Sequence, residues 1–181
     1  MRKALWLLVL VMAFATSAMA QDTPLLEAFG GYQYLRVGKG ANINMQGWNG
    51  SLAVNLNDWF GIVGDLSGSY QTRGGITNTL SMHTFTFGPQ FTYRKEKRTA
   101  PFVHALFGAA RNNQALSIFS LGPARANTVF AVMVGGGMDV KINDRFSIRA
   151  GQFDWMSTKF RNSRQSNFRF SIGLVVGFGK K

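Results

Sequence analysis

The chain has 181 residues, no cysteine and a formal net charge of +12. This length suits a single domain, and the lack of cysteine excludes disulfides and thiol chemistry. Only 15% of the residues are charged, whereas 21 are glycine and 16 are phenylalanine, a balance that is unusual for a water-soluble domain.

The N-terminus has the three parts of a secretory signal peptide. Residues 1–3 are basic, residues 4–15 are apolar, and residues 18–20 form an Ala-Met-Ala cleavage site. The apolar run is shorter than the roughly 20 residues that a membrane-spanning helix needs. We therefore predict that residues 1–20 are a cleaved signal peptide and that residues 21–181 form one domain.

Eight segments of the remaining chain have the character of β-strands. In chain order they are residues 26–37, 48–56, 60–70, 80–94, 101–112, 130–140, 145–159 and 168–178. In the second, third, sixth and eighth, apolar residues alternate strictly with small or polar ones, which indicates a strand with two unlike faces. Their apolar faces run for about 9 to 11 residues, the length of a tilted transmembrane strand. The opposite faces are mostly Gly, Ser, Ala and Asn and carry fewer charged residues than is expected on the solvent-exposed face of a soluble barrel.

Two irregularities interrupt the alternation. Pro89 lacks a backbone donor in the middle of a predicted strand, so we expect a bulge or kink near Gly88 and Pro89. The segment from Arg145 changes parity near Ala150 and Gly151, which a second bulge would explain.

The predicted connections alternate in length. Short ones fall at residues 57–58, 95–100 and 143–144, and longer ones at residues 38–45, 71–79, 113–127 and 160–165. Transmembrane barrels have short periplasmic turns and longer outer loops. The sequence thus predicts an all-β fold, an eight-stranded antiparallel up-and-down transmembrane β-barrel with both termini in the periplasm.

The inner face of this barrel would carry most of the charge. An eight-stranded barrel is just wide enough for side chains to fill it, and buried charges have to be paired. We therefore predict a network of ion pairs and hydrogen bonds that fills the lumen. Its members are Glu27, Asp65, Arg94, Asp139, Lys141, Arg149, Gln152, Asp154 and Arg169.

The sequence offers no convincing catalytic, cofactor or metal site. Only His83 and His104 are available as histidine bases, and neither has a serine partner that can be nominated with any specificity. The glycines at 135–137 lie inside a predicted strand and are not followed by a helix, so they do not form a phosphate-binding loop. No metal-ligand spacing is present. We predict that the protein is not an enzyme and has no cofactor.

The last predicted strand carries a recognisable pattern. Ser171, Gly173, Val176 and Phe178 place a polar residue, a glycine and two hydrophobic residues at fixed spacing. In this, and over essentially the whole of residues 21–181, the chain resembles the small OmpA-like outer-membrane β-barrel proteins, which present such a signal to the barrel-assembly machinery. The chain departs from the family in continuing for three residues beyond the aromatic. The resemblance implies a bacterial outer-membrane location.

We therefore predict an integral outer-membrane barrel with a structural or surface-interaction role. A narrow ion-conducting pore is the first alternative; a lipid A-modifying enzyme and a soluble barrel that binds a small apolar ligand are the others. Export argues against nucleic acid as the partner of this basic chain, and we expect a monomer. Several cations near the outer ends of the strands could meet lipopolysaccharide phosphates: Arg36, Lys39, Arg73, Arg111, Arg125, Lys159, Arg161 and Arg164.

Overall fold

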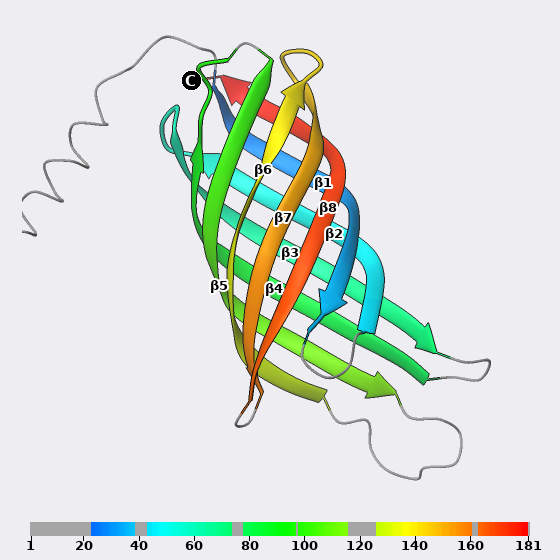
Figure 1. The fold of residues 1–181 in the computed structure, drawn as a ribbon. Coiled ribbons are helices and arrows are strands. Elements are labelled where there is room, and N and C mark those ends of the chain that lie inside the picture. The colour runs from blue at the N-terminus through cyan, green and yellow to red at the C-terminus, as the bar shows by residue number, and fades with distance from the viewer. Residues whose placement is uncertain are drawn as a thin grey trace, which may run out of the picture.

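The computed structural model describes residues 23–38, 43–73, 78–96, 98–115, 126–160 and 163–180. Its strands are β1 (Pro24–Val37), β2 (Ile43–Asn55), β3 (Phe60–Arg73), β4 (Asn78–Thr92), β5 (Thr99–Ala115), β6 (Ala126–Lys141), β7 (Phe146–Phe160) and β8 (Ser163–Lys180). Each strand pairs antiparallel with the next, and β8 pairs with β1, so the sheet closes into a barrel (Figure 1). The predicted eight-stranded up-and-down barrel is confirmed. The predicted signal peptide lies outside the described residues.

Within the part of the chain that the structure describes, no helix has the length and apolar character needed to cross a membrane.

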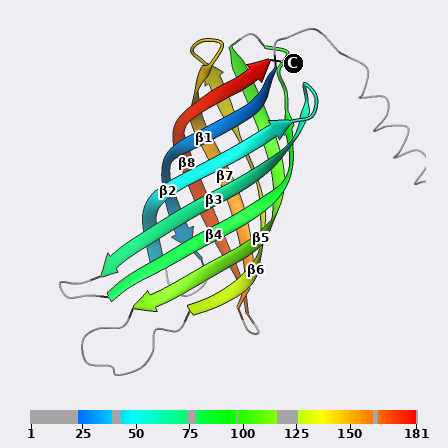
Figure 2. The ribbon, with the colours of Figure 1, turned by 180° about the vertical axis from the view of Figure 1, so that it is seen from behind.

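The two ends of the barrel differ in their connections (Figures 1 and 2). The turns that join β2 to β3, β4 to β5 and β6 to β7 lie at the end where β1 begins and β8 ends, which we call the turn end. Asn57 and Asn143 shape two of these turns in the same way, because the side-chain oxygen of each accepts hydrogen bonds from backbone N–H groups two and three residues later. The opposite end is the loop end.

The connections at the loop end are shorter than predicted. The β3–β4 ladder continues to Arg73 and Asn78, and the β7–β8 ladder continues to Phe160 and Ser163. Only residues 74–77 and 161–162 separate these strands, so the loops expected at 71–79 and 160–165 are partly strand. The alternation of side chains stops where hydrocarbon contact is no longer needed, but backbone hydrogen bonds between strands can continue beyond that point.

The outer wall of the barrel is apolar and the inner face carries the polar groups. Leu52, Ile62 and Leu174 are about half exposed on the outside, whereas Asp65 and Arg169 are buried inside. The predicted faces are therefore confirmed. A soluble barrel with an apolar ligand cavity, which requires the reverse arrangement, is contradicted.

One of the two predicted irregularities is present. Along β7 the register shifts between Arg149 and Gln152 against β8, and at the same level against β6. This is the bulge expected at Ala150 and Gly151, and it returns Gln152 to the inner face, where it is buried.

The bulge expected at Gly88 and Pro89 is absent. The β3–β4 register runs unbroken through Ile62 and Pro89, and the β4–β5 register is the same on both sides of the proline. Thr92 donates its N–H toward β3 and Tyr93 donates toward β5, so the missing N–H of Pro89 lies on the β5 side, where the ladder pairs lapse at residues 88 and 89. The strand tolerates the loss of one hydrogen bond without inserting a residue.

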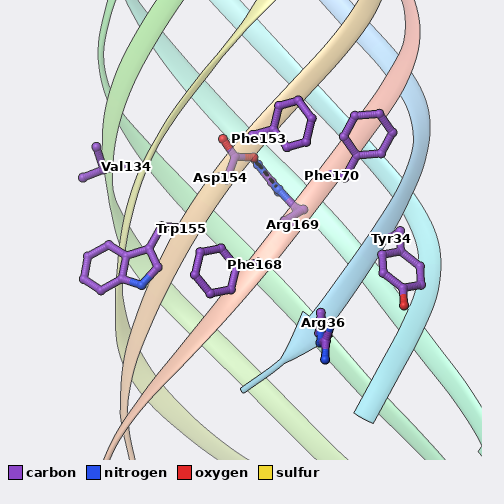
Figure 3. A pocket seen from close by; sticks show the side chains of 9 residues that line it. All are labelled: Tyr34, Arg36, Val134, Phe153, Asp154, Trp155, Phe168, Arg169 and Phe170. Atoms are coloured by element: carbon purple, nitrogen blue, oxygen red, sulfur yellow. Dashed lines mark hydrogen bonds and ion pairs between the residues drawn. The ribbon is translucent and has the colours of Figure 1, made fainter. Parts of the chain in front are cut away.

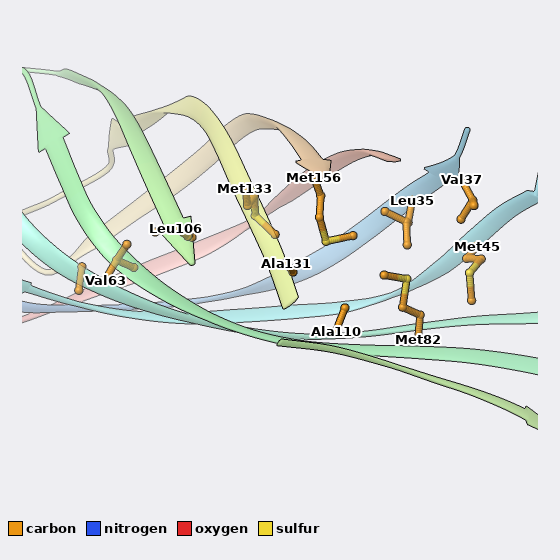
Figure 4. Packing of buried hydrophobic residues seen from close by; sticks show 11 residues of the cluster. Leu35, Val37, Met45, Val63, Met82, Leu106, Ala110, Ala131, Met133 and Met156 are labelled. Atoms are coloured by element: carbon orange, nitrogen blue, oxygen red, sulfur yellow. The ribbon is translucent and has the colours of Figure 1, made fainter. Parts of the chain in front are cut away.

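The lumen also contains an apolar core, most of which lies toward the loop end (Figure 4). We call this the methionine cluster, because methionine is its most frequent residue type, at Met45, Met82, Met133 and Met156. Its other buried members are Leu35, Val37, Ala53, Val63, Leu106, Ala110 and Ala131. The predicted inner face of small, polar and charged residues was therefore incomplete.

Strands β1 and β8 approach each other closely at the closing seam. Gly31 lies opposite Gly173, and a Cβ atom at Gly173 would overlap the backbone of Gly30. Glycine is needed here because the two backbones leave no room for a side chain.

Candidate functional site

Arg169 on β8 is the centre of the polar lumen. Its Nη1 and Nη2 donate to the two carboxylate oxygens of Asp65 at 2.7 and 3.0 Å, and its Nε donates to Asp154 Oδ2 at 2.7 Å. Arg169 is 2% exposed. A guanidinium that is removed from water in this way needs both carboxylates, because each fixed pair offsets part of the desolvation cost. Figure 3 shows the pair with Asp154 on the inner side of β7 and β8.

Each of these aspartates has further partners from other strands. Asn49 Nδ2 on β2 donates to Asp65 Oδ2 at 2.9 Å. His104 Nε2 on β5 lies 2.9 Å from Asp154 Oδ1, and Gln152 Nε2 donates to Asp154 Oδ2 at 2.8 Å. The carboxylates are thereby satisfied on several sides, as buried charges require.

A second arginine extends the network toward the turn end. Arg149 Nε and Nη2 donate to Asp139 at 2.8 and 3.0 Å, and Nη1 donates to Gln152 Oε1 at 2.7 Å. The Arg149 guanidinium also lies 4.3 Å from the ring centroids of both Phe29 and Phe102. This double contact is a cation–π arrangement that holds the charge in a dry setting.

A separate ion pair lies near the turn end. Arg94 Nη2 donates to Glu27 Oε2 at 2.8 Å, and Nη1 donates to the backbone oxygen of Asp58 at 3.1 Å. Arg94 thus ties β4 to β1 and to the turn between β2 and β3.

Every predicted member of the lumen network except Lys141 forms a side-chain ion pair or hydrogen bond among the described residues, but Glu27 and Arg94 form their own pair apart from the others. No ion pair within the described ranges includes Lys141, which lies at the turn end of β6 and is only partly buried. The other predicted members link β3, β6, β7 and β8 across the lumen, while Asn49 adds β2 and His104 adds β5. We call the connected set of Asn49, Asp65, His104, Asp139, Arg149, Gln152, Asp154 and Arg169 the charge network.

Glycine makes room for the charge network. A Cβ atom at Gly135 would overlap Asp154 Oδ1, and one at Gly137 would lie 2.9 Å from the ring of Phe102. Gly135 and Gly137 therefore serve packing in the lumen.

The two histidines have different surroundings. His104 is buried against Asp154, whereas His83 lies on the outer wall, where its Nε2 is 3.1 Å from the Tyr70 hydroxyl. In the described part of the chain, neither histidine forms a hydrogen bond with a serine. Across those same residues, no group of three or more His, Asp or Glu side chains could hold a metal ion.

The residues of the C-terminal pattern lie on β8 with alternating orientation. Ser171 is fully buried on the inner face and Gly173 lies at the seam with β1, while Phe178 is exposed on the outer wall and Val176 is partly buried there. All four lie on the strand that closes the barrel.

Sequence reasoning missed several residues that complete the lumen. Asn49 and Thr86 were seen only as small or polar neighbours, and His104 was considered only as a base. The methionines share the parity of charged residues on their own strands: Met133 lies six positions before Asp139, and Met156 lies two after Asp154. This shared parity is the feature of the sequence that indicates an inward position for both methionines.

Comparison with known proteins gives a family and several structural matches. The family model described as the outer membrane protein beta-barrel domain matches residues 6–179. No curated protein sequence matches the chain. Among solved structures, Neisserial surface protein A superposes with a TM-score of 0.72 at 10% identity, covering 88% of this chain and 100% of that one.

Two further structures have the same barrel. The attachment invasion locus protein Ail of Yersinia pestis gives a TM-score of 0.58 at 16% identity, covering 84% of this chain and 99% of its own. OprG from Pseudomonas aeruginosa gives 0.59 at 8% identity, with 88% and 98% covered. At these identities the likeness shows the fold.

Proposed function

The chain belongs to the outer membrane protein beta-barrel domain family and is a bacterial outer-membrane protein, and we propose that it acts as a sealed, non-enzymatic barrel with a structural or surface-interaction role. The observation that carries this proposal is the filling of the lumen by two successive layers. The charge network spans its middle, and the methionine cluster fills it toward the loop end.

The central side chains of both layers are buried. Arg169 and Asp154 are each 2% exposed, and Met133 is fully buried beside them, with its sulfur 3.2 Å from Arg169 Nη2. An ion that crossed the barrel would have to displace paired charges and then pass through an apolar segment, where its own desolvation is costly. The arrangement supports a closed barrel.

Conductance in planar bilayers tests the sealed lumen. We expect the wild-type barrel to add no steady conductance, and the double variant Met133→Gly with Arg169→Ala to conduct, because it removes one element of each layer. Discrete wild-type channels would overturn the proposal and favour the narrow pore.

One observation favours that pore as the alternative. Several buried polar atoms within the described residues have no hydrogen-bond partner, among them Gln33 Oε1, Thr158 Oγ1 and Asn167 Oδ1. Such atoms suit ordered water, and a connected file of water would offer an ion a path. The conductance measurement separates the two functions directly.

The placement of the histidines supports a non-enzymatic role. His104 is committed to Asp154 inside the lumen, and His83 is bonded to Tyr70 on the outer wall. We expect the mass spectrum of lipid A to be unchanged when the protein is expressed. A mass shift equal to the loss or gain of an acyl chain would contradict the non-enzymatic role and favour a lipid A-modifying enzyme.

We propose lipopolysaccharide as the surface partner. Arg36 on β1 and Arg111 on β5 are exposed near the loop end, where a guanidinium can bind phosphate. The side chains of the other predicted cations, Lys39, Arg73, Arg125, Lys159, Arg161 and Arg164, lie outside the described part of the structure. Co-purification of lipopolysaccharide with the detergent-solubilised barrel, reduced in the double variant Arg36→Gln with Arg111→Gln, is the expected result.

We propose that β8 is presented to the barrel-assembly machinery and that the finished barrel is a monomer. Val176 and Phe178 project from the same outer side of β8, so both could be read at once. We expect Phe178→Asp to lower the yield of heat-modifiable, folded protein in cells while Phe130→Asp lowers it less. Sedimentation in detergent should give the mass of one chain.

A further inference from the structure

A groove of about 410 Å³ lies on the outer wall, over β6, β7, β8 and β1 (Figure 3). Its walls are the side chains of Tyr34, Val134, Phe153, Trp155, Phe168 and Phe170, and Arg36 lies at its edge nearest the loop end. Asp154 and Arg169 belong to the inner side of the same wall, where they are bonded to each other. The groove therefore faces the membrane and is closed behind by the charge network.

Two aromatic rings on neighbouring strands form one wall of the groove. Phe153 on β7 and Phe170 on β8 are cross-strand partners, with ring centroids 4.8 Å apart and planes tilted by 47°. Gly151 lies beside this pair, and a Cβ atom there would lie 3.3 Å from the ring of Phe170. The pair can therefore form because position 151 has no side chain.

The two ends of the groove differ in chemistry. Most of its wall is aromatic or aliphatic and matches hydrocarbon. Arg36 is exposed one residue before the end of β1, and the structure records no ion pair for it with any described residue. Its outward cross-strand partner Asn44 and the nearby Gln46, which pairs with Tyr34, are exposed as well. An unpaired guanidinium among polar side chains at a membrane interface attracts a lipid phosphate.

We propose that this groove holds one acyl chain of lipid A, with a lipid A phosphate bound by Arg36. The loop end is the end predicted to face outward, and the lipid of that leaflet combines several acyl chains with phosphate on one headgroup. The inference rests on the proposed contact with lipopolysaccharide and gives it a specific location. The hydrocarbon explains the aromatic wall, and the phosphate explains the cation at its outer edge.

Trp155 reports on occupancy because it lines the groove. A single-tryptophan version of residues 21–181 needs only Trp48→Phe and Trp59→Phe. We would fold it in phosphatidylcholine nanodiscs and titrate purified lipid A into them. We expect a saturable change in Trp155 emission, and no comparable change when phosphatidylglycerol replaces lipid A.

Matched substitutions locate the phosphate and the acyl chain. Arg36→Gln should weaken lipid A binding about tenfold, the effect of losing one charge-assisted contact. Arg145→Gln removes an exposed arginine of the β6–β7 turn, at the turn end and away from the groove, and should leave the titration unchanged. Phe168→Ala should weaken binding, whereas Phe130→Ala, which removes an equally exposed ring outside the groove, should not. Heat-modifiable gel mobility checks that each variant is folded.

Three results would overturn the groove site. These are equal binding by Arg36→Gln and wild type, equal weakening by Arg145→Gln, and an equal response to phosphatidylglycerol, which would indicate an ordinary anionic lipid shell. If the titration fails while lipopolysaccharide still co-purifies with the barrel, the general contact stands and only its location is wrong. Failure of both would remove the proposed partner, and the conductance test of the sealed lumen is independent of either.

Discussion

The two layers of the lumen close the same barrel by opposite means. In the middle, the charge network joins three aspartates and two arginines from distant strands with directed hydrogen bonds. Toward the loop end, the methionine cluster fills the space with flexible apolar side chains that form no directed bonds with one another. The first layer depends on the geometry of every partner, whereas the second depends mainly on volume.

This difference predicts unequal tolerance to substitution. Removing one member of a buried ion pair leaves an uncompensated charge, and the rest of the network cannot move to water. Methionine, in contrast, has three rotatable bonds and adapts to irregular space. Substitutions in the charge network should therefore lower the stability of the barrel more than comparable substitutions in the methionine cluster.

The largest effect is expected for Arg169→Met. It leaves Asp65 and Asp154 without their shared cation, so we expect the free energy of unfolding to fall by about 3 to 5 kcal/mol. Urea titration of the barrel in phospholipid vesicles, followed by gel mobility, measures it. Arg111→Met, on the exposed outer wall, is the control and should change little. A smaller loss of unfolding free energy than in the methionine variants would contradict the expected sensitivity of the charge network.

Met156→Ala should have the next largest effect. Met156 is 1% exposed, and truncating a buried methionine costs about 2 to 5 kcal/mol. We expect a value near the lower limit, because Met133 and Met45 can relax into the space. The same urea titration applies, and a loss as large as that of Arg169→Met would show that the two layers are equally rigid.

Gly135→Ala tests the room left for Asp154. The added methyl group would overlap Asp154 Oδ1 and the backbone oxygen of Phe153, and overpacking of this kind costs about 1 to 3 kcal/mol. Gly64→Ala is the control, since a Cβ atom there has nothing within 4 Å. Equal stability of both variants would mean that Asp154 is free to shift.

The smallest effect is expected for Met156→Leu. The volume hardly changes, so the free energy of unfolding should fall by less than about 1.5 kcal/mol and the barrel should stay closed in planar bilayers. New conductance in this variant would show that the cluster seals by the specific shape of methionine, contrary to the comparison above.

The local features of the fold could be predicted from the sequence. Alternation fixed the two faces of each strand, and the parity change at Ala150 and Gly151 located the β7 bulge. Pro89 was misread because the sequence does not say which neighbouring strand its nitrogen faces, and that side decides how much pairing is lost. Loop lengths were overestimated because strands continue through polar residues such as Arg73 and Asn78.

The contacts within the lumen could not be predicted to the same extent. Inward parity selected Arg169 and Asp65, but these residues are 104 positions apart, and only the register of the closed barrel brings them together. The parity of Met133 and Met156 would have placed both inside. Both are apolar, however, and an expected polar inner face gives no reason to place an apolar residue there.

The closing seam bears on how such a chain can be made. Gly31 on β1 pairs with Gly173 on β8. The first strand of the chain therefore lacks one of its two neighbouring strands until the last strand is in place. A nascent or truncated chain that lacks β8 has two unpaired edge strands, which can pair with other chains and cause aggregation. The barrel cannot close until the whole chain up to β8 is present. The chain is therefore most prone to aggregation between the export of β1 and the export of β8.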